Sequence, residues 1–344
     1  MALESNIVVE SVDEFTDSFF IYDVVIIGAG VAGLYAAYCC GISGLSCCVI
    51  DSLPQAGGQC VALYPEKNIY GVPGFINVKA KDYIEILSNQ CLGYAKETFF
   101  NQKVQHISKT KTGKFCVKTA ENTIFSKHLI IASGIGDMKP NVPNNVKGLS
   151  TLKQDSDFVQ HYCMKLDIYK GKNVIIAGGG DSAVDFAINI APIAKKVFLI
   201  HRKDKLTCEA CKLSELRKLC NSSKLELSLE NQILEIEDNS KRIVRTTKKE
   251  FEVDHIVFCY GFLPSCNLID GLTNLGMHIE NGVINSDINT METAIENCYA
   301  AGDVASYVNK KKNIVPCYFE ADRAVRSIKS KISKEVSNHA VYKG

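Results

Sequence analysis

The stretch VVIIGAGVAGLYAA at residues 24–37 decides the fold of this chain. Its four apolar residues predict a buried strand, the glycines predict a tight turn, and the small residues that follow predict a helix. Gly28, Gly30 and Gly33 stand in a GxGxxG pattern that also contains Ala32. In such a unit the first glycine makes the turn, the second lets the backbone approach a pyrophosphate, and the third lets the helix pack on the strand. We therefore expect a dinucleotide site at this turn.

An acid at a fixed distance makes this pattern more specific than an isolated GxGxxG. The next apolar stretch, LSCCVID, ends at Asp51, 23 residues after Gly28. At the end of the second strand of such a unit, a carboxylate accepts hydrogen bonds from the hydroxyls of an adenosine ribose. We therefore expect the first site to take an adenosine whose ribose is unmodified.

A second stretch, VIIAGGGDSAVDFA at residues 174–187, repeats the pattern. Its next strand ends differently, because His201, Arg202 and Lys203 stand where the acid would be. A basic cluster pairs with a 2′-phosphate, which an acid would repel, so this site should prefer NADPH to NADH. The alternative is that the three basic residues only form a solvated strand end. The NADPH contacts expected in the glycine turn are Gly178, Gly179, Gly180, Asp181, Ser182 and Ala183.

Two dinucleotide sites in one chain indicate FAD in the first and NADPH in the second. The nicotinamide would then deliver a hydride to flavin N5, a step that needs positioning rather than acid–base groups. We therefore expect an FAD-dependent oxidoreductase that has no acid–base catalytic residue and no metal. A rival hypothesis of another class is a flavin- and NADP-binding redox sensor without turnover.

Length and composition limit the other classes of protein. The chain has 344 residues, 46% of them apolar, which is enough for two domains with sizeable cores. Lys and Arg number 39 against 38 Asp and Glu, so the strong basic excess of a nucleic-acid-binding protein is missing. No apolar run approaches the length of a membrane span. The expected fold class is α/β, with two Rossmann-like domains, each a parallel sheet with an antiparallel β insertion.

Alternating polar and apolar residues place the insertions at 104–126 and 225–257. After residue 285 the chain has no glycine turn of its own, so we expect it to return to the first domain. Gly and Pro cluster near 133–145 and 260–295, where the chain would cross between domains. The expected division is an FAD-binding domain of residues 1–135 plus 290–344 and an inserted NADPH-binding domain of residues 136–289.

The N-terminal stretch and the cysteines predict a cellular compartment. Residues 1–23 carry six acids and neither Lys nor Arg, unlike a secretory signal or a mitochondrial presequence. The 15 cysteines lie mostly in apolar runs, as small buried side chains do in a reducing compartment. We therefore expect a cytoplasmic protein.

Four stretches together resemble the ferredoxin–NADP reductases built on the thioredoxin-reductase plan, over residues from about 20 to 330. They are GGQCVALYPEKNIYGVPGF (57–75), GGGDSAVDFA, VFCYGFLPS and NCYAAGDVASY. The resemblance implies a homodimeric enzyme that moves electrons between NADPH and ferredoxin, or flavodoxin, with single-electron release from the flavin.

The same resemblance implies further FAD contacts. Gly57, Gly58 and Gln59 would run beside the FAD, and Tyr64 would stack on the flavin ring, where offset stacking contributes about 0.5–1.5 kcal/mol. The alternative for Tyr64 is a core tyrosine with a bonded hydroxyl. The other implied contacts are Val104 at the adenine, Met138 where the family often has Phe, and Asp303 at a ribityl hydroxyl.

This sequence departs from the resembling family at several positions. Lys203 and Thr207 stand where relatives carry arginines, so the predicted 2′-phosphate site has fewer arginines to bind the phosphate. Residues 314–321, IVPCYFEA, replace a glycine-rich stretch. Near the end of the chain, His339 or Tyr342 would be the residue that covers the flavin of a partner subunit.

Cysteine spacing argues against the disulfide-reductase alternative. Where thioredoxin reductases have a CxxC, Cys163 stands alone with Leu166 at the partner's position, and Cys60 is followed by Pro65 where lipoamide-type enzymes have a second cysteine. Cys208 and Cys211 form a CxxC beside the basic cluster, which we interpret as coincidental. Electrons should therefore leave for an external acceptor. Lys310, Lys311 and Lys312 would attract an acidic ferredoxin, or else form an ordinary solvated loop.

Overall fold

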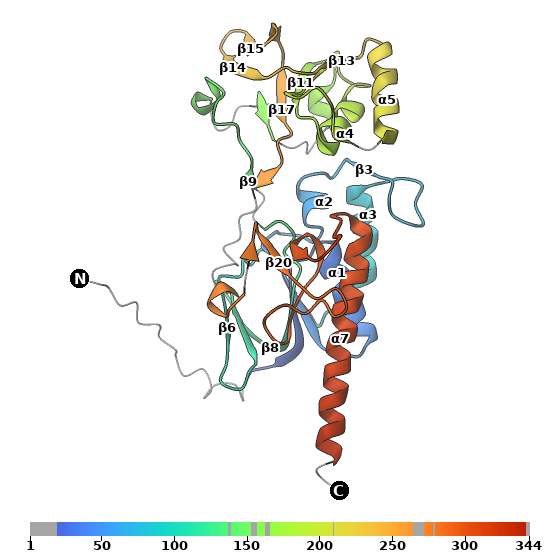
Figure 1. The fold of residues 1–344 in the computed structure, drawn as a ribbon, viewed down its shortest axis with the longest axis vertical. Helices are drawn as coiled ribbons and strands as arrows, with labels where there is room; N and C mark the ends of the chain where they lie inside the picture. The colour runs from blue at the N-terminus through green and yellow to red at the C-terminus, as the bar shows by residue number, and fades with distance from the viewer. Residues whose placement is uncertain are drawn as a thin grey trace, which may run out of the picture. The chain divides into compact units, whose positions relative to one another are not determined.

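The computed structural model describes residues 19–136, 139–152, 157–161, 166–208, 210–263, 272–277 and 279–341. The chain divides into two compact units. The first comprises Met1–Gly58, Ile84–Asp137 and Pro264–Gly344, and the second comprises Gln59–Tyr83 and Met138–Leu263 (Figure 1). The predicted division differs in two segments, since it placed 59–83 with the first domain and 264–289 with the second.

The first unit is built on one mixed sheet with the strand order β5-β2-β1-β8-β7-β6, and β21 also pairs with β8. Strands β1, β2, β5, β8 and β21 run parallel, whereas β6 and β7 form an antiparallel meander with the start of β8. The predicted antiparallel insertion after the first nucleotide unit is therefore confirmed. The strands are β1 Ile21–Ile27, β2 Cys47–Ile50, β5 Glu97–Phe99, β6 His106–Lys109, β7 Phe115–Lys118, β8 Thr123–Ile131 and β21 Cys298–Ala300.

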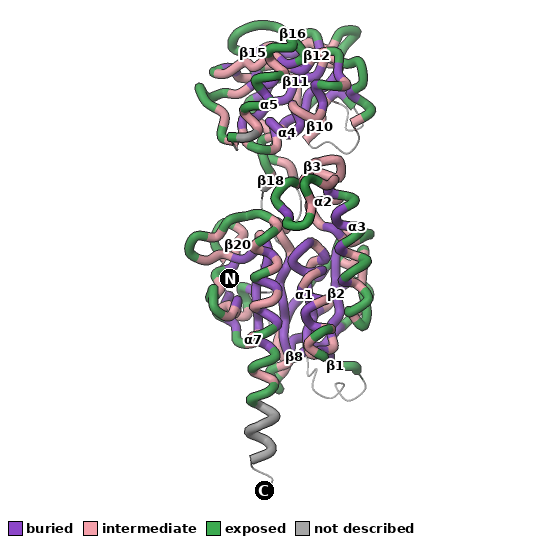
Figure 2. The backbone as a smooth tube through the Cα atoms, turned by 90° about the vertical axis from the view of Figure 1, so that its right-hand side faces the viewer, coloured by how far each residue is buried: buried purple, intermediate pink, exposed green. Residues whose placement is uncertain are grey.

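Helix α1, Val31–Ile42, is apolar around most of its circumference because both sides are covered. It packs on the sheet and along α7, Ile314–Val341, and the rings of Tyr35 and Tyr318 meet edge to face at 4.8 Å. Within this unit, Figure 2 shows α1, β1, β2 and β8 as largely buried. Further helical segments of this unit are α3 Ala80–Cys91, which begins in the second unit, η2 Leu92–Tyr94 and η5 Gly302–Val304.

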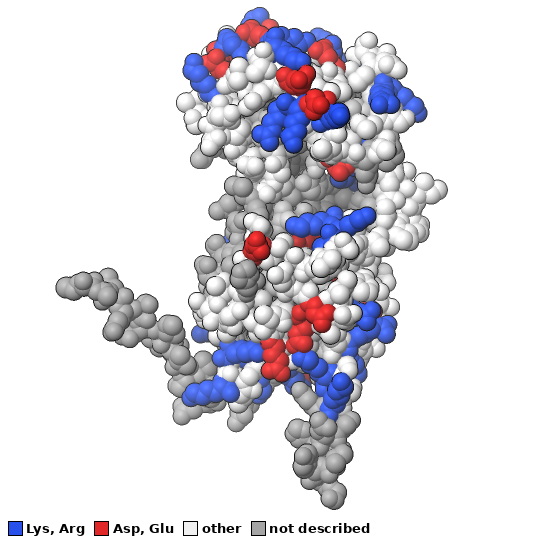
Figure 3. Space-filling model, in the orientation of Figure 1, with Lys and Arg blue, Asp and Glu red and all other residues white. Residues whose placement is uncertain are grey.

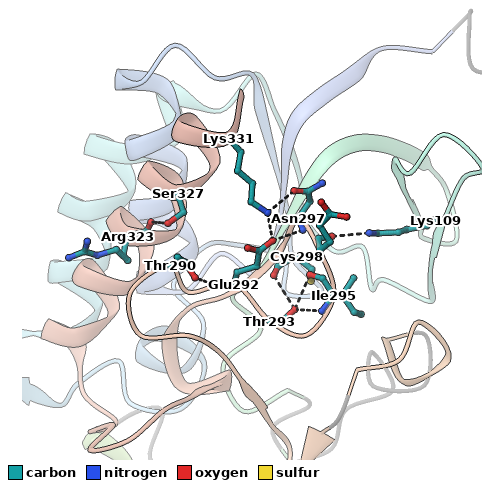
Figure 4. Close-up of polar contacts among 11 residues, drawn as sticks. Lys109, Thr290, Glu292, Thr293, Ile295, Asn297, Cys298, Arg323, Ser327 and Lys331 are labelled. Atoms are coloured by element: carbon teal, nitrogen blue, oxygen red, sulfur yellow. Dashed lines mark hydrogen bonds and ion pairs between the residues drawn. The ribbon is translucent and has the colours of Figure 1, made fainter. Parts of the chain in front are cut away.

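The late part of the chain is fixed to the first unit by the turn that precedes β21 (Figure 4). Glu292 Oε1 accepts hydrogen bonds from Lys331 Nζ of α7 at 2.5 Å and from the backbone N–H of Asn297 at 2.8 Å. Thr293 Oγ1 donates to the carbonyl of Cys298 at 3.0 Å. These contacts hold β21 beside β8, as expected for a segment that returns to complete the first sheet.

The second unit contains a five-stranded sheet in the order β10-β17-β11-β12-β13, with all neighbours parallel. Helices α4 and α5 belong to the same unit. The elements are β10 Val159–Gln160, β11 Asn173–Ala177, β12 Lys196–Ile200, β13 Leu225–Ser228, β17 His255–Phe258, η4 Leu166–Tyr169, α4 Asp181–Ile190 and α5 Ala210–Asn221.

The second antiparallel insertion is shorter than predicted. It consists of β14 Ile233–Asp238, β15 Arg242–Thr246 and β16 Glu250–Glu252. The start and end of the predicted 225–257 meander instead belong to the parallel sheet, as β13 and β17. Strand β13 lies at the sheet edge and is buried fully only at Leu225, so its sequence alternates like that of a meander strand.

Small elements complete the two units. Two-stranded sheets pair β3 with β4 and β9 with β18, and a three-stranded sheet contains β19, β20 and β22. None of the helices in the described part of the chain combines the length and the apolar content needed to cross a bilayer. The bounds are α2 Gln59–Ala62, β3 Asn68–Ile69, β4 Val78–Lys79, β9 Lys139–Pro140, η3 Leu149–Thr151, β18 Phe262–Leu263, β19 Ile279–Glu280, β20 Val283–Asn285 and β22 Ala305–Ser306.

Candidate functional site

The first glycine turn, between β1 and α1, has the geometry of a phosphate cradle. Gly28 has φ +107°, and a Cβ there would lie 2.3 Å from the carbonyl oxygen of Ala132. A Cβ at Gly33 would lie 1.8 Å from the carbonyl oxygen of Gly28, so the helix packs directly on the turn. A Cβ at Gly30 would meet nothing within 4 Å. Packing therefore requires the outer two glycines, while the middle one faces open space at the N-terminus of α1, where a pyrophosphate would bind.

The GG pair after β2 lies against this cradle. Gly57 has φ +126°, and its N–H donates to the carbonyl oxygen of Ala29 at 2.8 Å. A Cβ at Gly58 would lie 3.1 Å from the Cα of Gly30. The structure thus brings Gly58, predicted from the resemblance, directly beside the middle glycine of the cradle.

Asp51 follows β2 and points its carboxylate at the same turn. Its Oδ2 accepts from the N–H of Ala29 at 2.5 Å, and its Oδ1 accepts from the N–H of Leu53 at 2.8 Å. Burial raises the pKa of Asp51, and the backbone N–H donors only partly oppose that shift. Each carboxylate oxygen can accept more than one hydrogen bond, so both remain able to accept from ribose hydroxyls.

Asp303 reaches the first cradle through its neighbour Gly302. Gly302 has φ +82°, and a Cβ there would lie 3.0 Å from the Cβ of Ala32 in the first turn of α1. Asp303 follows in η5 and is half-buried. Residues more than 250 positions apart in the sequence, Ala32 and Asp303, therefore lie close to one another.

A buried acid that the sequence analysis overlooked holds this turn in place. Glu320 of α7 is 0% exposed and accepts hydrogen bonds from the N–H of Gly302 at 2.7 Å and from the hydroxyl of Tyr307 at 2.6 Å. Its Oε1 also forms an ion pair with Lys310, whose side chain is 7% exposed. The sequence feature that could have revealed Glu320 is its position as a single acid on the apolar face of a helix, a face that includes the buried Ala321 and Ala324.

The remaining predicted FAD contacts are placed as follows. Val104 is buried, and it follows a segment in which the N–H of Gln102 donates to the carbonyl of Asp51 at 2.9 Å. Gln59 and Tyr64 belong to the second unit. Met138 lies outside the described residues.

The second glycine turn, between β11 and α4, resembles the first in its geometry. Gly178 has φ +153°, and a Cβ there would lie 2.7 Å from the carbonyl oxygen of Cys259. A Cβ at Gly179 would lie 2.3–2.4 Å from three atoms of the His201 ring. A Cβ at Gly180 would meet nothing within 4 Å, and Ala183 is buried in the first turn of α4. Gly180, which corresponds to Gly30 of the first turn, therefore faces open space at a helix N-terminus.

The basic cluster after β12 lies beside this turn. Burial lowers the pKa of His201, and the positive charges of Lys203 and Arg202 lower it further. Its Nε2 is buried and has no hydrogen-bond partner among the described residues, whereas Arg202 and Lys203 are exposed. Thr207, which stands where relatives have an arginine, donates its N–H to the carbonyl of Gly179 at 2.7 Å. The loop that carries the cluster is therefore tied to the cradle.

Acids and lysines form a network along α4. Asp181, in the first turn, pairs with Lys212 at 2.9 Å, and Asp185 pairs with Lys212 at 3.0 Å and with Lys67 at 2.7 Å. Burial alone would lower the pKa of Lys212, but the hydrogen bond to Asp181 and the charge of Asp185 outweigh it and raise that pKa. These lysines offset the acids that would otherwise repel a phosphate at this helix N-terminus.

Tyr64 lies within the second unit, near the start of α4. Its ring centroid is 6.1 Å from that of Phe186, and its hydroxyl hydrogen-bonds the side chain of Ser182. Burial raises the pKa of Tyr64. A flavin contact of this residue stays a prediction.

Only some of the cysteines singled out in the sequence lie in the described part of the chain. Cys60 and Cys208 are half-buried and form no disulfide, and the described residues contain no cluster of three potential metal-binding side chains. The side chain of Cys211 lies outside the described part of the chain, as do Cys163, Tyr342 and the side chain of His339.

The chain is similar to proteins of one family over nearly its whole length. The family described as pyridine nucleotide-disulphide oxidoreductase matches residues 22–328. A ferredoxin–NADP reductase of Halalkalibacterium halodurans is 37% identical over 320 residues, covering 90% of this chain and 93% of that protein. One from Rickettsia canadensis is 35% identical over 326 residues, covering 93% of this chain and 95% of that protein.

Solved structures with the same fold include thioredoxin reductases. The enzyme of T. acidophilum superimposes with a TM-score of 0.77 at 25% identity, covering 90% of this chain and 98% of that one. The enzyme of Lactococcus lactis superimposes with a TM-score of 0.76 at 21% identity, which shows the fold alone, over 91% and 99% of the two chains. The expected α/β architecture of two Rossmann-like domains is thereby confirmed.

Proposed function

The chain belongs to the pyridine nucleotide-disulphide oxidoreductase family and, within it, to the ferredoxin–NADP reductases, and on this premise we propose that it passes electrons between NADPH and ferredoxin through FAD. The observation that carries the proposal is the contrast between two similar cradles. Asp51 stands at the first, and His201, Arg202 and Lys203 stand at the second.

The first cradle suits FAD. The open space at Gly30 admits a pyrophosphate, and the buried carboxylate of Asp51 suits an unmodified adenosine ribose. Glu320 accepts a hydrogen bond from the N–H of Gly302, and by holding this turn it would orient Asp303 toward the cofactor. The residues proposed to hold FAD are Gly28, Gly30, Ala32, Gly33, Asp51, Gly58, Gln59, Tyr64, Val104, Met138 and Asp303.

The second cradle suits NADPH. The Nε2 of His201 lacks a partner among the described residues, and two exposed basic side chains follow it directly. Such a set matches the charge and the acceptors of a 2′-phosphate. The residues proposed to hold NADPH are Gly178, Gly179, Gly180, Asp181, Ser182, Ala183, His201, Arg202 and Lys203.

Bound FAD supplies the chemistry, because it accepts two electrons as a hydride and releases them singly. The protein's residues bind and orient the two cofactors and exclude water from them. None of these residues is assigned a proton transfer. We propose that the first unit is the FAD-binding domain and that the second binds NADPH.

Electrons would leave to an external acceptor. Neither Cys60 nor Cys163 has a second cysteine at the spacing that thioredoxin reductases or lipoamide-type enzymes use. Lys310 cannot attract a partner as predicted, because it is buried in its ion pair with Glu320. Lys311 and Lys312 are exposed, and we propose that these two contribute to ferredoxin docking. On the face drawn in Figure 3, positive and negative side chains are otherwise interspersed.

Three finer points complete the proposal. Flavodoxin would serve as an alternative acceptor, since it also takes single electrons. The enzyme would act as a homodimer, which light scattering of the purified protein tests. It would work in the cytoplasm, where a reducing environment keeps thiols such as Cys39, Cys40, Cys47 and Cys48 free.

Steady-state kinetics test the proposal. The purified protein should be yellow, and it should reduce ferredoxin with NADPH at a higher kcat/KM than with NADH. Substitution of Arg202 by Ala should reduce that preference about tenfold or more, because a charge-assisted hydrogen bond contributes about 1.5–3 kcal/mol. A colourless protein that cannot be loaded with FAD would contradict the proposal.

A further inference from the structure

The two glycine turns differ in the charge at the start of the helix that follows each of them. Helix α1 has no acid in its first turn, whereas α4 begins with Asp181, directly after the open position at Gly180. The unpaired N–H groups of a helix N-terminus attract an anion, but a carboxylate beside a bound phosphate repels it. Asp185 adds a second carboxylate one turn further along α4. The second turn therefore needs a counter-charge that the first turn does not need.

Lys212 of α5 lies where it can supply this counter-charge. Its Nζ is 2.9 Å from a carboxylate oxygen of Asp181 and 3.0 Å from one of Asp185. The Lys212 side chain is only 13% exposed, so water screens these ion pairs less than it would at an open surface. Burial alone would lower the pKa of Lys212, but the two carboxylates outweigh it and raise that pKa, so the ammonium is charged at neutral pH.

Lys67 completes the charge balance at the start of α4. Its Nζ lies 2.7 Å from Asp185 Oδ2, so Asp185 keeps a cationic partner when Lys212 is replaced. The two carboxylates and the two ammonium groups balance, and removal of Lys212 leaves one more negative charge at this helix N-terminus. Asp181, whose side chain is 48% exposed, is the acid next to the open position at Gly180. A phosphate bound there would be repelled most by this carboxylate.

We propose that Lys212 is a positioning residue for the pyrophosphate of NADPH, because its pairing with Asp181 and Asp185 keeps the N-terminus of α4 able to accept an anion. The inference rests on the proposed function, since it requires the second cradle to hold NADPH. Lys212 acts through Asp181, so it affects any ligand that carries a phosphate at this turn. The basic cluster after β12 has the separate role of selecting the 2′-phosphate.

Calorimetric titration of the FAD-loaded protein with two ligands tests the inference. NADP⁺ carries both the pyrophosphate and the 2′-phosphate, whereas adenosine 2′-monophosphate carries only the latter. Lys212→Met keeps an unbranched side chain but removes the charge. It should weaken NADP⁺ binding about threefold to tenfold, the size of a charge effect at a helix N-terminus, and leave the affinity for adenosine 2′-monophosphate unchanged. Lys212→Arg, which keeps the charge, should retain most of the NADP⁺ affinity.

The double substitution Asp181→Asn with Lys212→Met separates this role from a merely structural one. It removes the uncompensated carboxylate, so the NADP⁺ affinity should recover. Lys218→Met is the matched control, because Lys218 is an exposed lysine of the same helix, and it should change the affinity for neither ligand.

Three results would show that the inference is wrong while the proposed function stands. They are an unchanged NADP⁺ affinity in Lys212→Met, an equal loss for both ligands, and no recovery in the double variant. If the unsubstituted protein binds neither ligand, the proposed function itself fails.

Discussion

The ring of His201 lies directly over Gly179, so that a Cβ on the glycine would come within 2.3 Å of the imidazole Cε1. The same glycine accepts the N–H of Thr207 through its carbonyl oxygen. One residue of the cradle thus positions both ends of the loop that carries the basic cluster. Under the proposed function, selection for the 2′-phosphate would therefore depend on Gly179 as well as on the charged side chains.

Substitution of Gly179 by Ala should displace His201 and the loop behind it. We expect the affinity for adenosine 2′,5′-bisphosphate to fall about tenfold and the flavin content to stay unchanged, because the two cradles lie in separate units. Titration calorimetry measures the first quantity and absorbance the second. Gly93→Ala is the control, since a Cβ there meets nothing within 4 Å. Unchanged bisphosphate affinity in Gly179→Ala would contradict the role given to His201.

Two glycines of the first cradle should respond differently to alanine. Gly33→Ala places a Cβ 1.8 Å from the carbonyl oxygen of Gly28, so the free energy of unfolding should fall by about 1–3 kcal/mol. Gly30→Ala meets no protein atom within 4 Å, so the protein without FAD should keep its stability but bind FAD more weakly. Urea unfolding and flavin titration separate the two effects. Equal FAD affinity in Gly30→Ala and the unsubstituted protein would remove the pyrophosphate from this turn.

The buried ion pair of Glu320 and Lys310 should stabilise the protein only while both charges are present. Glu320→Gln leaves a buried ammonium without its counter-charge, which costs about 3–5 kcal/mol in comparable cases, and it should also loosen the turn that carries Asp303. We expect lower stability in urea and faster release of FAD.

The double substitution Glu320→Gln with Lys310→Met is the control for this effect. It removes the uncompensated charge, so it should recover most of the stability while FAD release stays fast. If the double variant is no more stable than Glu320→Gln alone, burial of the lysine charge is not the cause.

Charge reversal at Lys311 and Lys312 tests the proposed ferredoxin docking site. Both side chains are exposed, so a Lys→Glu change at each should leave the fold and the NADPH kinetics intact. The kcat/KM for ferredoxin should fall about threefold to tenfold at low ionic strength, and the difference should shrink as salt screens the charges. Lys248→Glu, an exposed change in the second unit, is the matched control. If the unsubstituted protein, the Lys311 and Lys312 variant and Lys248→Glu have the same ferredoxin kinetics, these two lysines do not form the docking site.

His128, in β8, should make the protein sensitive to acid. Burial lowers its pKa to about 4 in the folded protein, against an ordinary value of 6.5. Between these values the unfolded chain binds a proton that the folded chain does not, so stability falls as the pH drops from 6.5 toward 4. At pH 5 the loss should be about 2 kcal/mol, since each pKa unit corresponds to about 1.36 kcal/mol.

Urea unfolding of the FAD-loaded protein at pH 7 and pH 5 measures this loss. His128→Phe has no such proton to bind, so its difference between the two pH values should be smaller by that amount. The same pH dependence in both proteins would show that other groups control acid stability.

The parts of the fold that follow local rules could be predicted from the sequence. Both glycine turns, the strands and helices beside them, and Asp51 at the end of β2 depend on patterns within about 30 residues. The return of the chain to the first sheet could also be expected, because 298–300 lack a cradle of their own. The strand at 225–228 was assigned to the wrong sheet because an edge strand of a parallel sheet alternates like a meander strand.

The residues that were missed depend on contacts over long sequence distances. Lys310 looked like a solvated loop lysine, and only the fold brings it to Glu320. Lys212 gave no local signal, since its place beside Asp181, 31 residues earlier, follows from the packing of α5 against α4. Local patterns specify an element, whereas the partner of a side chain depends on topology.

Anaerobic mixing of the yellow protein with NADPH, followed by an acceptor, tests the central claim most directly. We predict that NADPH bleaches the flavin absorbance and that oxidised ferredoxin restores it within the time of one turnover. Thioredoxin with a disulfide should leave the flavin bleached. Recovery of the colour by the disulfide mixture and not by ferredoxin would contradict the claim.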